Sequence, residues 1–399
     1  MRQSIESAAE SGTGERCRMK VAFDDQCFRM QRLGGISRYS DELMTRLAGL
    51  GVQVVRQSSY TDNAFDSHGR SGLRPHLESR VRGYVLGGVK LVSGRDMFSK
   101  FVRDQERREP WLSEQSFDIF HPTYYDPYFL PHLHGRPFLL TVHDMIIEIF
   151  PEYFPLDDPV REWKRLLVGK AAAIMVNSES AKRDLLRFIK VDESKVVVNY
   201  LGCSLRADSG IEEPNAPWKH WRYLLFVGNR TAYKNFFFML QALEPVFAQY
   251  PEMKMVCIGG GRFEEPEKRF FESLALQGRM HHLDVDDNHL VSVYKNALAF
   301  VFPSLYEGFG LPVLEAFECG CPVLASKSGS LPEVGSDAAL YFDPKDASSI
   351  SDTVAMVIEQ EALREEMRKK GKERCKAFSW DQNALRTKEL YEQVMMARR

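Results

Sequence analysis

Two glutamates stand on either side of a glycine-rich loop in the second half of the chain, within residues 299–325, AFVFPSLYEGFGLPVLEAFECGCPVLA. Glu307 begins this loop, and Glu315 follows a proline of the kind that suits the first turn of a helix. A strand, a glycine loop and a helix start together offer free backbone N–H groups to an anion. Two carboxylates beside such a site can accept hydrogen bonds from hydroxyl pairs on a sugar and a ribose. The spacing alone fits a capping glutamate and a surface glutamate equally well.

The residues E-G-F-G-L-P-V-L-E, followed by A-x-x-x-G-x-P-V, resemble the two-glutamate signature of glycosyltransferase family 4, a family of retaining enzymes with the GT-B fold. The resemblance implies an α/β fold of two Rossmann-like domains that face an interdomain cleft, with a C-terminal helix crossing back to the first domain. It implies that Glu307 contacts the transferred sugar and that Glu315 contacts the ribose diol. It also implies that backbone amides around Phe309, Gly310 and Leu311 meet the sugar and the diphosphate.

Two cations, Arg230 and Lys234, follow a predicted strand in the stretch FVGNRTAYKN. A departing nucleoside diphosphate gains negative charge, which fixed cations stabilise in the transition state. The stretch looks like the Arg/Lys pair of the same family, which implies a catalytic role for both residues. The alternative is a pair of solvated surface cations.

The first half of the chain contributes a histidine and a pair of glycines. His143 ends a strongly apolar strand in the run Thr-Val-His-Asp, where a histidine is often a structural residue. The resemblance implies instead that His143 contacts the donor sugar near the reaction centre. Gly34 and Gly35 follow the first strand and open a helix, at the position of the family's N-terminal glycine loop, whose amides approach the diphosphate. Most Gly-Gly pairs are simple turns.

Further loops resemble the nucleotide side of the family's donor site. They contain Gly259 and Gly260 after an apolar run, and Asp287 further on. Turns between strands and helices explain these residues equally well.

A metal site is not expected. Asp284-Val285-Asp286 matches the D-x-D pair of the other glycosyltransferase fold, but it also fits a turn before a helix at 290–296, and the two cations can neutralise a diphosphate. His281, His282 and His289 lie nearby without the spacing of a metal-ligand set. We therefore predict a nucleotide-sugar donor as substrate, with no metal and no other cofactor.

Two stretches of the first half are candidates for binding an acceptor. Tyr124, Tyr125 and Tyr128 lie in an aromatic run that could form a wall against the apolar face of a sugar, or could pack in the core. Residues 80–108 mix arginines and lysines with apolar residues, a pattern that fits contact with an anionic membrane surface or a lipid-linked diphosphate, and also fits a solvated helix face. The predicted acceptor is a saccharide or a lipid-linked saccharide.

Short apolar runs alternate with longer segments of helical period, which predicts β-α units and parallel sheets. The predicted strands are 21–23, 52–55, 119–121, 138–142, 174–177, 196–200, 223–227, 254–258, 299–303 and 322–325, and the predicted helices include 37–49, 180–188, 237–249, 290–296, 312–319 and one after 378. We expect a disordered extension at 1–18, a first domain at 19–204, a linker at 205–221, a nucleotide-sugar-binding domain at 222–378 and a returning helix at 379–399.

The composition is that of an ordinary globular protein, with 44% hydrophobic and 27% charged residues. The formal net charge of −2 gives no reason to expect nucleic acid as a partner. Seven scattered cysteines, no apolar run of about 18 residues and no signal-peptide core predict a cytoplasmic protein, with peripheral contact at the inner face of a membrane left open.

The residues favour one activity over several alternatives. The runs His-Pro-Thr-Tyr-Tyr and Thr-Val-His-Asp look most like bacterial transferases of surface polysaccharide, including lipopolysaccharide, which favours mannose from GDP-mannose as the transferred sugar. A UDP- or ADP-sugar donor, or a sugar-nucleotide epimerase of the same fold, is the alternative. A nicotinamide oxidoreductase is disfavoured because no G-x-G-x-x-G follows either opening strand.

Overall fold

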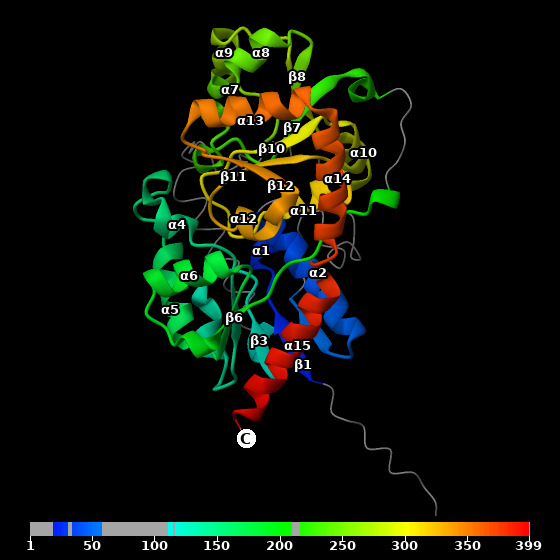
Figure 1. Ribbon diagram of the computed structural model, residues 1–399. Coiled ribbons are helices and arrows are strands. Elements are labelled where there is room, and N and C mark those ends of the chain that lie inside the picture. The colour runs from blue at the N-terminus through cyan, green and yellow to red at the C-terminus, as the bar shows by residue number, and fades with distance from the viewer. Residues whose placement is uncertain (1–18, 31–33, 58–110, 115, 210–215, 399) are drawn as a thin grey trace, which may run out of the picture.

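The computed structural model describes residues 19–30, 34–57, 111–114, 116–209 and 216–398 (Figure 1). The predicted extension at 1–18 and the basic stretch at 80–108 lie outside these residues. Among the described residues, no helix is long and apolar enough to cross a membrane.

The N-terminal domain is built on short parallel strands that are mostly buried. Their bounds are β1 (Lys20–Phe23), β2 (Gln53–Arg56), β3 (Ile119–His121), β4 (Leu139–Val142), β5 (Ala173–Val176) and β6 (Val196–Val198). They form the sheets β2-β1-β3 and β4-β5-β6, which a single bridge between Phe120 and Phe138 joins. All residues of β4 and β5 are buried, as expected for parallel strands covered by helices on both faces.

The C-terminal domain contains one six-stranded parallel sheet in the order β12-β11-β10-β7-β8-β9. Its strands are β7 (Arg222–Val227), β8 (Met253–Ile258), β9 (Met280–Leu283), β10 (Ala299–Phe302), β11 (Val323–Ser326) and β12 (Ala339–Phe342). The strand order changes direction between β10 and β7. The carboxyl ends of these two neighbours therefore open onto the place where a doubly wound sheet binds its ligand.

Helices cover the sheets of both domains (Figure 1). In the N-terminal domain they are α1 (Gln26–Met30), α2 (Gly35–Gly49), α4 (Ile146–Ile149), α5 (Val160–Lys170) and α6 (Glu179–Phe188). In the C-terminal domain they are α7 (Phe236–Ala242), α8 (Glu244–Gln249), α9 (Glu265–Ser273), α10 (Asp287–Asn296), α11 (Leu311–Glu318), α12 (Leu331–Gly335), α13 (Ala347–Glu359) and α14 (Glu361–Cys375). One cluster of buried apolar side chains extends through both domains.

The last helix, α15 (Trp380–Met396), leaves the end of α14 and returns to the N-terminal domain, as the red helix of Figure 1 shows. It packs against α2. Asn199, just beyond β6, donates to the Asn383 carbonyl and to the Thr387 hydroxyl, each at 3.0 Å. The predicted crossing helix and the two-domain α/β fold are confirmed.

Several predicted elements differ in detail. The helix expected at 237–249 is two helices, because Pro245 begins a new helix with its ring in the first turn, where no amide donor is needed. Strands β9 and β12 were not predicted. Both are four-residue edge strands that are only partly buried, and the two histidines of β9 weaken its apolar pattern.

Candidate active site

Glu307 lies in the loop between β10 and α11 and is paired with a lysine from the segment that follows the neighbouring strand β7. Lys234, at the end of the short 3-10 helix Ala232–Lys234 that follows β7, donates from Nζ to Glu307 Oε1 at 2.6 Å. Both side chains are largely buried, with 16% of Lys234 and 10% of Glu307 exposed. Burial lowers the pKa of Lys234, but the Glu307 carboxylate outweighs this effect and raises the pKa to about 12. The ammonium group of the segment after β7 therefore lies directly beside the carboxyl group of the loop.

The same loop touches the N-terminal domain at Gly308. A Cβ atom on Gly308 would lie 2.1 Å from the carbonyl oxygen of His143 and 2.8 Å from Cβ of Asp144. Gly310 has a φ of 97° and caps the start of α11, a left-handed conformation that favours glycine. Thus one loop glycine allows the two domains to meet and the other allows the helix to begin.

His143 follows β4 and is buried at this contact. Its backbone N–H donates to the Tyr125 hydroxyl at 3.0 Å, and the Asn177 amide donates to its carbonyl at 3.3 Å. Burial lowers the pKa of His143 to about 4, while Asp144 opposes this change and Lys164 adds to it. The imidazole is therefore neutral near pH 7 and brings no second cation to the site.

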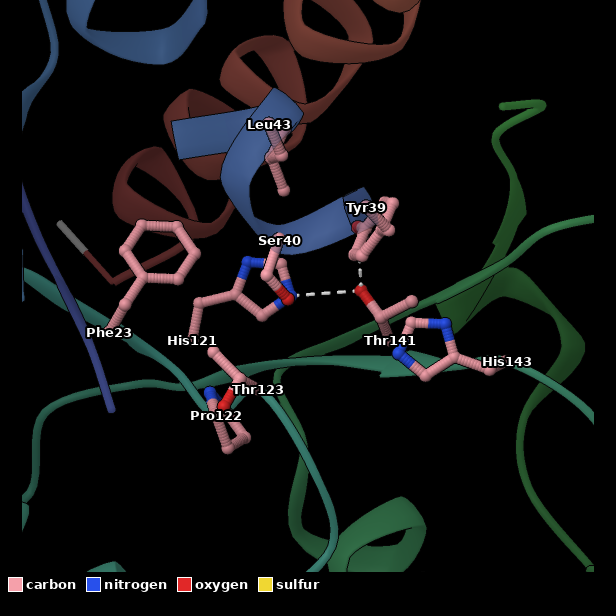
Figure 2. Close-up of a pocket in the computed structure, with 9 residues that line it drawn as sticks. All are labelled: Phe23, Tyr39, Ser40, Leu43, His121, Pro122, Thr123, Thr141 and His143. Atoms are coloured by element: carbon pink, nitrogen blue, oxygen red, sulfur yellow. Dashed lines mark hydrogen bonds between the residues drawn. The ribbon is translucent and has the colours of Figure 1, made fainter. Parts of the chain in front are cut away.

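A small pocket lies beside His143 within the N-terminal domain (Figure 2). Its wall includes His121, whose Nε2 is 2.9 Å from the Thr141 hydroxyl, which in turn lies 3.0 Å from the Tyr39 hydroxyl. His121 Nδ1 meets the hydroxyl of Tyr391, on the crossing helix, at 2.6 Å. The Tyr39 ring packs edge-on against His143, with 5.2 Å between ring centroids. These hydrogen bonds thus connect Tyr391 of α15 to Tyr39, whose ring packs against His143.

Glu315 lies on α11 and is buried. Tyr294 of α10 donates to its Oε2 at 3.2 Å, and the Oε1 atom is 3.5 Å from Nη1 of Arg38. Arg38 comes from α2 of the other domain, and its Nη2 donates to Oδ1 of Asp287 at 2.8 Å. Burial raises the pKa of Glu315, and the positive charge of Arg38 opposes this increase.

The starts of α2 and α11 come together beside these residues. Gly34 precedes α2 and Gly35 is its first residue, and a Cβ on Gly35 would lie 3.7 Å from the Leu311 side chain, the first residue of α11. The Phe309 ring is buried and packs on Phe378, with 5.7 Å between ring centroids. The backbone, rather than the side chain, of Phe309 is therefore the part that can meet a ligand.

Arg230 is held by a second glycine loop. Its guanidinium donates to the carbonyls of Gly259, Gly260 and Gly261 at 2.8, 3.2 and 2.9 Å. Its Nε donates to Glu267 at 2.6 Å. The three glycines all have positive φ, so the arginine stabilises a turn that other residues rarely adopt.

The three tyrosines proposed for an acceptor wall are not equivalent. Tyr125 and Tyr128 are buried in the core of the N-terminal domain, and only Tyr124 is partly exposed. Without a rearrangement, an acceptor can meet only Tyr124 of the three.

Three hydrogen bonds of the domain contact had no usable signal in the sequence. Glu333 of α12 accepts from the amides of Glu179 and Ser180 at the start of α6, at 2.7 and 3.1 Å. Ser178 donates from its hydroxyl to the Gly308 carbonyl at 2.7 Å. Ser178 has the residue type of a helix cap, but nothing in its neighbourhood points to a partner 130 residues away.

Two parallel α/β domains that meet beside a buried carboxylate–lysine pair, with a C-terminal helix that returns to the first domain, define a GT-B glycosyltransferase. Two family models match the chain, one described as Glycosyltransferase Family 4 over residues 33–206 and one as Glycosyl transferases group 1 over residues 212–374. The chain belongs to this family of glycosyltransferases, as the glutamate signature predicted.

Individual relatives agree with this assignment. The O-antigen chain mannosyltransferase B of Escherichia coli is 29% identical over 393 residues, which cover 94% of this chain and 99% of that protein. The structure of sucrose-phosphate synthase from Thermosynechococcus elongatus matches with a TM-score of 0.71 at 20% identity, over 95% of this chain and 100% of that chain. HepE of Anabaena, in complex with UDP and glucose, matches with a TM-score of 0.69 at 15% identity, over 94% and 100% of the two chains. The two solved structures share the fold.

Proposed function

We propose that this glycosyltransferase is a retaining enzyme that moves a sugar from a nucleotide-sugar donor to a saccharide or lipid-linked saccharide in surface-polysaccharide synthesis. The observation that carries the proposal is the contact of 2.6 Å between Lys234 Nζ and Glu307 Oε1, since Glu307 lies on the loop that contacts the backbone of His143. The favoured donor is GDP-mannose, from which mannose is transferred. The similarity to an O-antigen chain mannosyltransferase over nearly the full length of both chains supports this choice.

In the proposed reaction, the bond between C1 of the sugar and the donor diphosphate breaks while the acceptor oxygen bonds to C1 from the same face. The acceptor proton passes to an oxygen of the departing diphosphate. Lys234 and the amides at the start of α11 stabilise the charge that develops on this leaving group. Glu307 accepts a hydrogen bond from a sugar hydroxyl, and neutral His143 orients the sugar without adding charge.

Arg230 is the second proposed cation for the leaving group. Its hydrogen bonds to Glu267 and to the loop at Gly259 mean that it must give up partners before it can bind a phosphate oxygen. We therefore expect Arg230→Ala to reduce turnover less than Lys234→Ala does.

The first test is a thermal-shift panel of UDP, GDP and ADP, because a nucleotide that binds the folded protein raises its melting temperature. The favoured donor predicts the largest shift with GDP. Transfer is then measured with radiolabelled GDP-mannose, UDP-glucose and ADP-glucose and mannose-terminated acceptors, and proton NMR gives the configuration of the new bond. An inverted product would overturn the retaining mechanism, and nucleotide release without any acceptor would favour an epimerase.

A further inference from the structure

Arg38 is the one residue of the N-terminal domain seen to form ion pairs with both Asp287 and Glu315 in the described part of the chain. It stands one turn into α2, where its backbone N–H donates to the Gly34 carbonyl at 3.0 Å. Only 11% of its side chain is exposed. The guanidinium is therefore enclosed at the domain contact, beside the glutamate that we assign to the ribose.

The two carboxylates hold Arg38 in different ways. The bond to Asp287, at 2.8 Å, is a short charge-assisted hydrogen bond, and it fixes the position of the guanidinium. The distance to Glu315, 3.5 Å, is too long for a good hydrogen bond but short enough for a strong attraction between charges. Arg38 thus supports the negative charge of Glu315 while leaving its Oε1 lone pairs to other donors.

The other surroundings of Glu315 make this support necessary. Asp287 brings a like charge, and the thiols of Cys203 and Cys319 lie close by. Tyr294 donates one hydrogen bond to Oε2, which alone is a modest compensation for a buried carboxylate. Without a nearby cation, such a carboxyl group takes up a proton.

We propose that Arg38 is a positioning residue for the donor site: it keeps Glu315 ionised and open to the ribose hydroxyls, while Asp287 holds Arg38 in place. This inference rests on the proposed function, since it assumes that Glu315 meets the ribose of a nucleotide. It assigns part of the donor site to the N-terminal domain. Nucleotide binding and domain contact are then coupled through a single side chain.

The test measures the affinity of GDP and of 2′,3′-dideoxy-GDP by calorimetry between pH 6 and 8.5. The variants are Arg38→Gln and Arg38→Lys, with Arg46→Gln as the matched control. Arg46 lies on the same helix and pairs with Asp381 of α15 at 2.8 Å, so this control removes an equal charge and also a cross-helix ion pair. We expect Arg38→Gln to weaken GDP binding at pH 7 by about tenfold, because most Glu315 carboxyl groups would then be protonated and unable to accept from both ribose hydroxyls.

The expected pattern separates this role from others. The pH at which GDP affinity declines should move upward in Arg38→Gln, with recovery at high pH and partial rescue by Arg38→Lys. Dideoxy-GDP, which lacks the hydroxyls, should bind Arg38→Gln and the wild type alike, and Arg46→Gln should match the wild type throughout. In a Glu315→Gln background, Arg38→Gln should have no further effect on GDP.

Two results would overturn the inference. Equal weakening of GDP and dideoxy-GDP would mean that Arg38 acts on the diphosphate or on folding, and an unshifted pH profile would mean that it does not tune Glu315. A wild-type protein that binds none of GDP, UDP and ADP would instead refute the proposed function. If UDP or ADP binds in place of GDP, the same comparison is made with that nucleotide and its dideoxy form.

Discussion

Replacing Gly308 by alanine tests whether the contact between the Glu307 loop and His143 is needed for transfer. The new Cβ would lie 2.1 Å from the His143 carbonyl oxygen, whereas real Cβ atoms essentially never approach another heavy atom within 3.0 Å. The loop and the strand end must therefore separate by at least 0.9 Å, the difference between these two distances. Both sides of the clash are close to the backbone, so no flexible side chain can move away to relieve it.

A displacement of this size is enough to disturb catalysis, because a shift of about 1 Å in a reacting group can cost roughly 100-fold in rate. We expect Gly308→Ala to lower kcat by about that factor, while each domain keeps its own core and the far-ultraviolet circular dichroism is unchanged. The matched control is Gly278→Ala in the same domain, where a Cβ would meet nothing within 4 Å. Steady-state kinetics of both variants with saturating donor and acceptor make the comparison. Turnover of Gly308→Ala within twofold of Gly278→Ala would refute the reasoning.

Three further predictions concern the glutamates, the metal and the pH. Glu307→Ala should mainly lower turnover, by roughly 10²–10³-fold, and Glu315→Ala should mainly weaken nucleotide binding. Steady-state kinetics measure the first effect and calorimetry with nucleotide measures the second. Near-normal turnover of Glu307→Ala would exclude its role at the sugar. Activity should survive EDTA, and a loss that Mn²⁺ or Mg²⁺ restores would contradict a metal-free site. Burial lowers the pKa values of His121 and His143 to about 3 and about 4, below the 6.5 of an exposed histidine, so the unfolded chain binds more protons as the pH falls below 6.5. Each histidine should therefore cost about 1.4 kcal/mol of stability between pH 7.5 and 5.5, and the Tm of His121→Asn should fall less over that range than that of the wild type.

The sequence was most informative where one segment carries a whole structural unit. The strand, glycine loop and helix around Glu307 were predicted because their residues are contiguous and each has a local physical reason. Lys234 was placed after a strand for the same reason. That its ammonium group meets Glu307, 73 residues away, depends on β7 and β10 being neighbours in the sheet, an order that local pattern does not determine.

Contacts between the domains were beyond sequence reasoning. The Arg38–Asp287 hydrogen bond spans 249 residues, and neither residue type nor spacing identifies such a pair in advance. The sequence also does not show which tyrosines of the aromatic run near residue 125 are buried, since the same run of tyrosines could pack in a core or form a sugar-binding wall. Tertiary packing places Tyr125 and Tyr128 in the core and leaves Tyr124 at its edge.

The charges of the site form a consistent system. A buried carboxylate is costly unless it is paired, and each of the two signature glutamates has a cation beside it: Lys234 for Glu307 and Arg38 for Glu315. In the proposed complex, hydroxyl groups of the nucleotide-sugar donate to the two glutamates, and its phosphate oxygens accept from Lys234. Lys234 and Glu307 then exchange one polar partner for another, while Arg38 stays beside Glu315. Such an exchange limits the cost of separating the buried ion pair when a doubly charged diphosphate binds, because neither side chain is left without a partner.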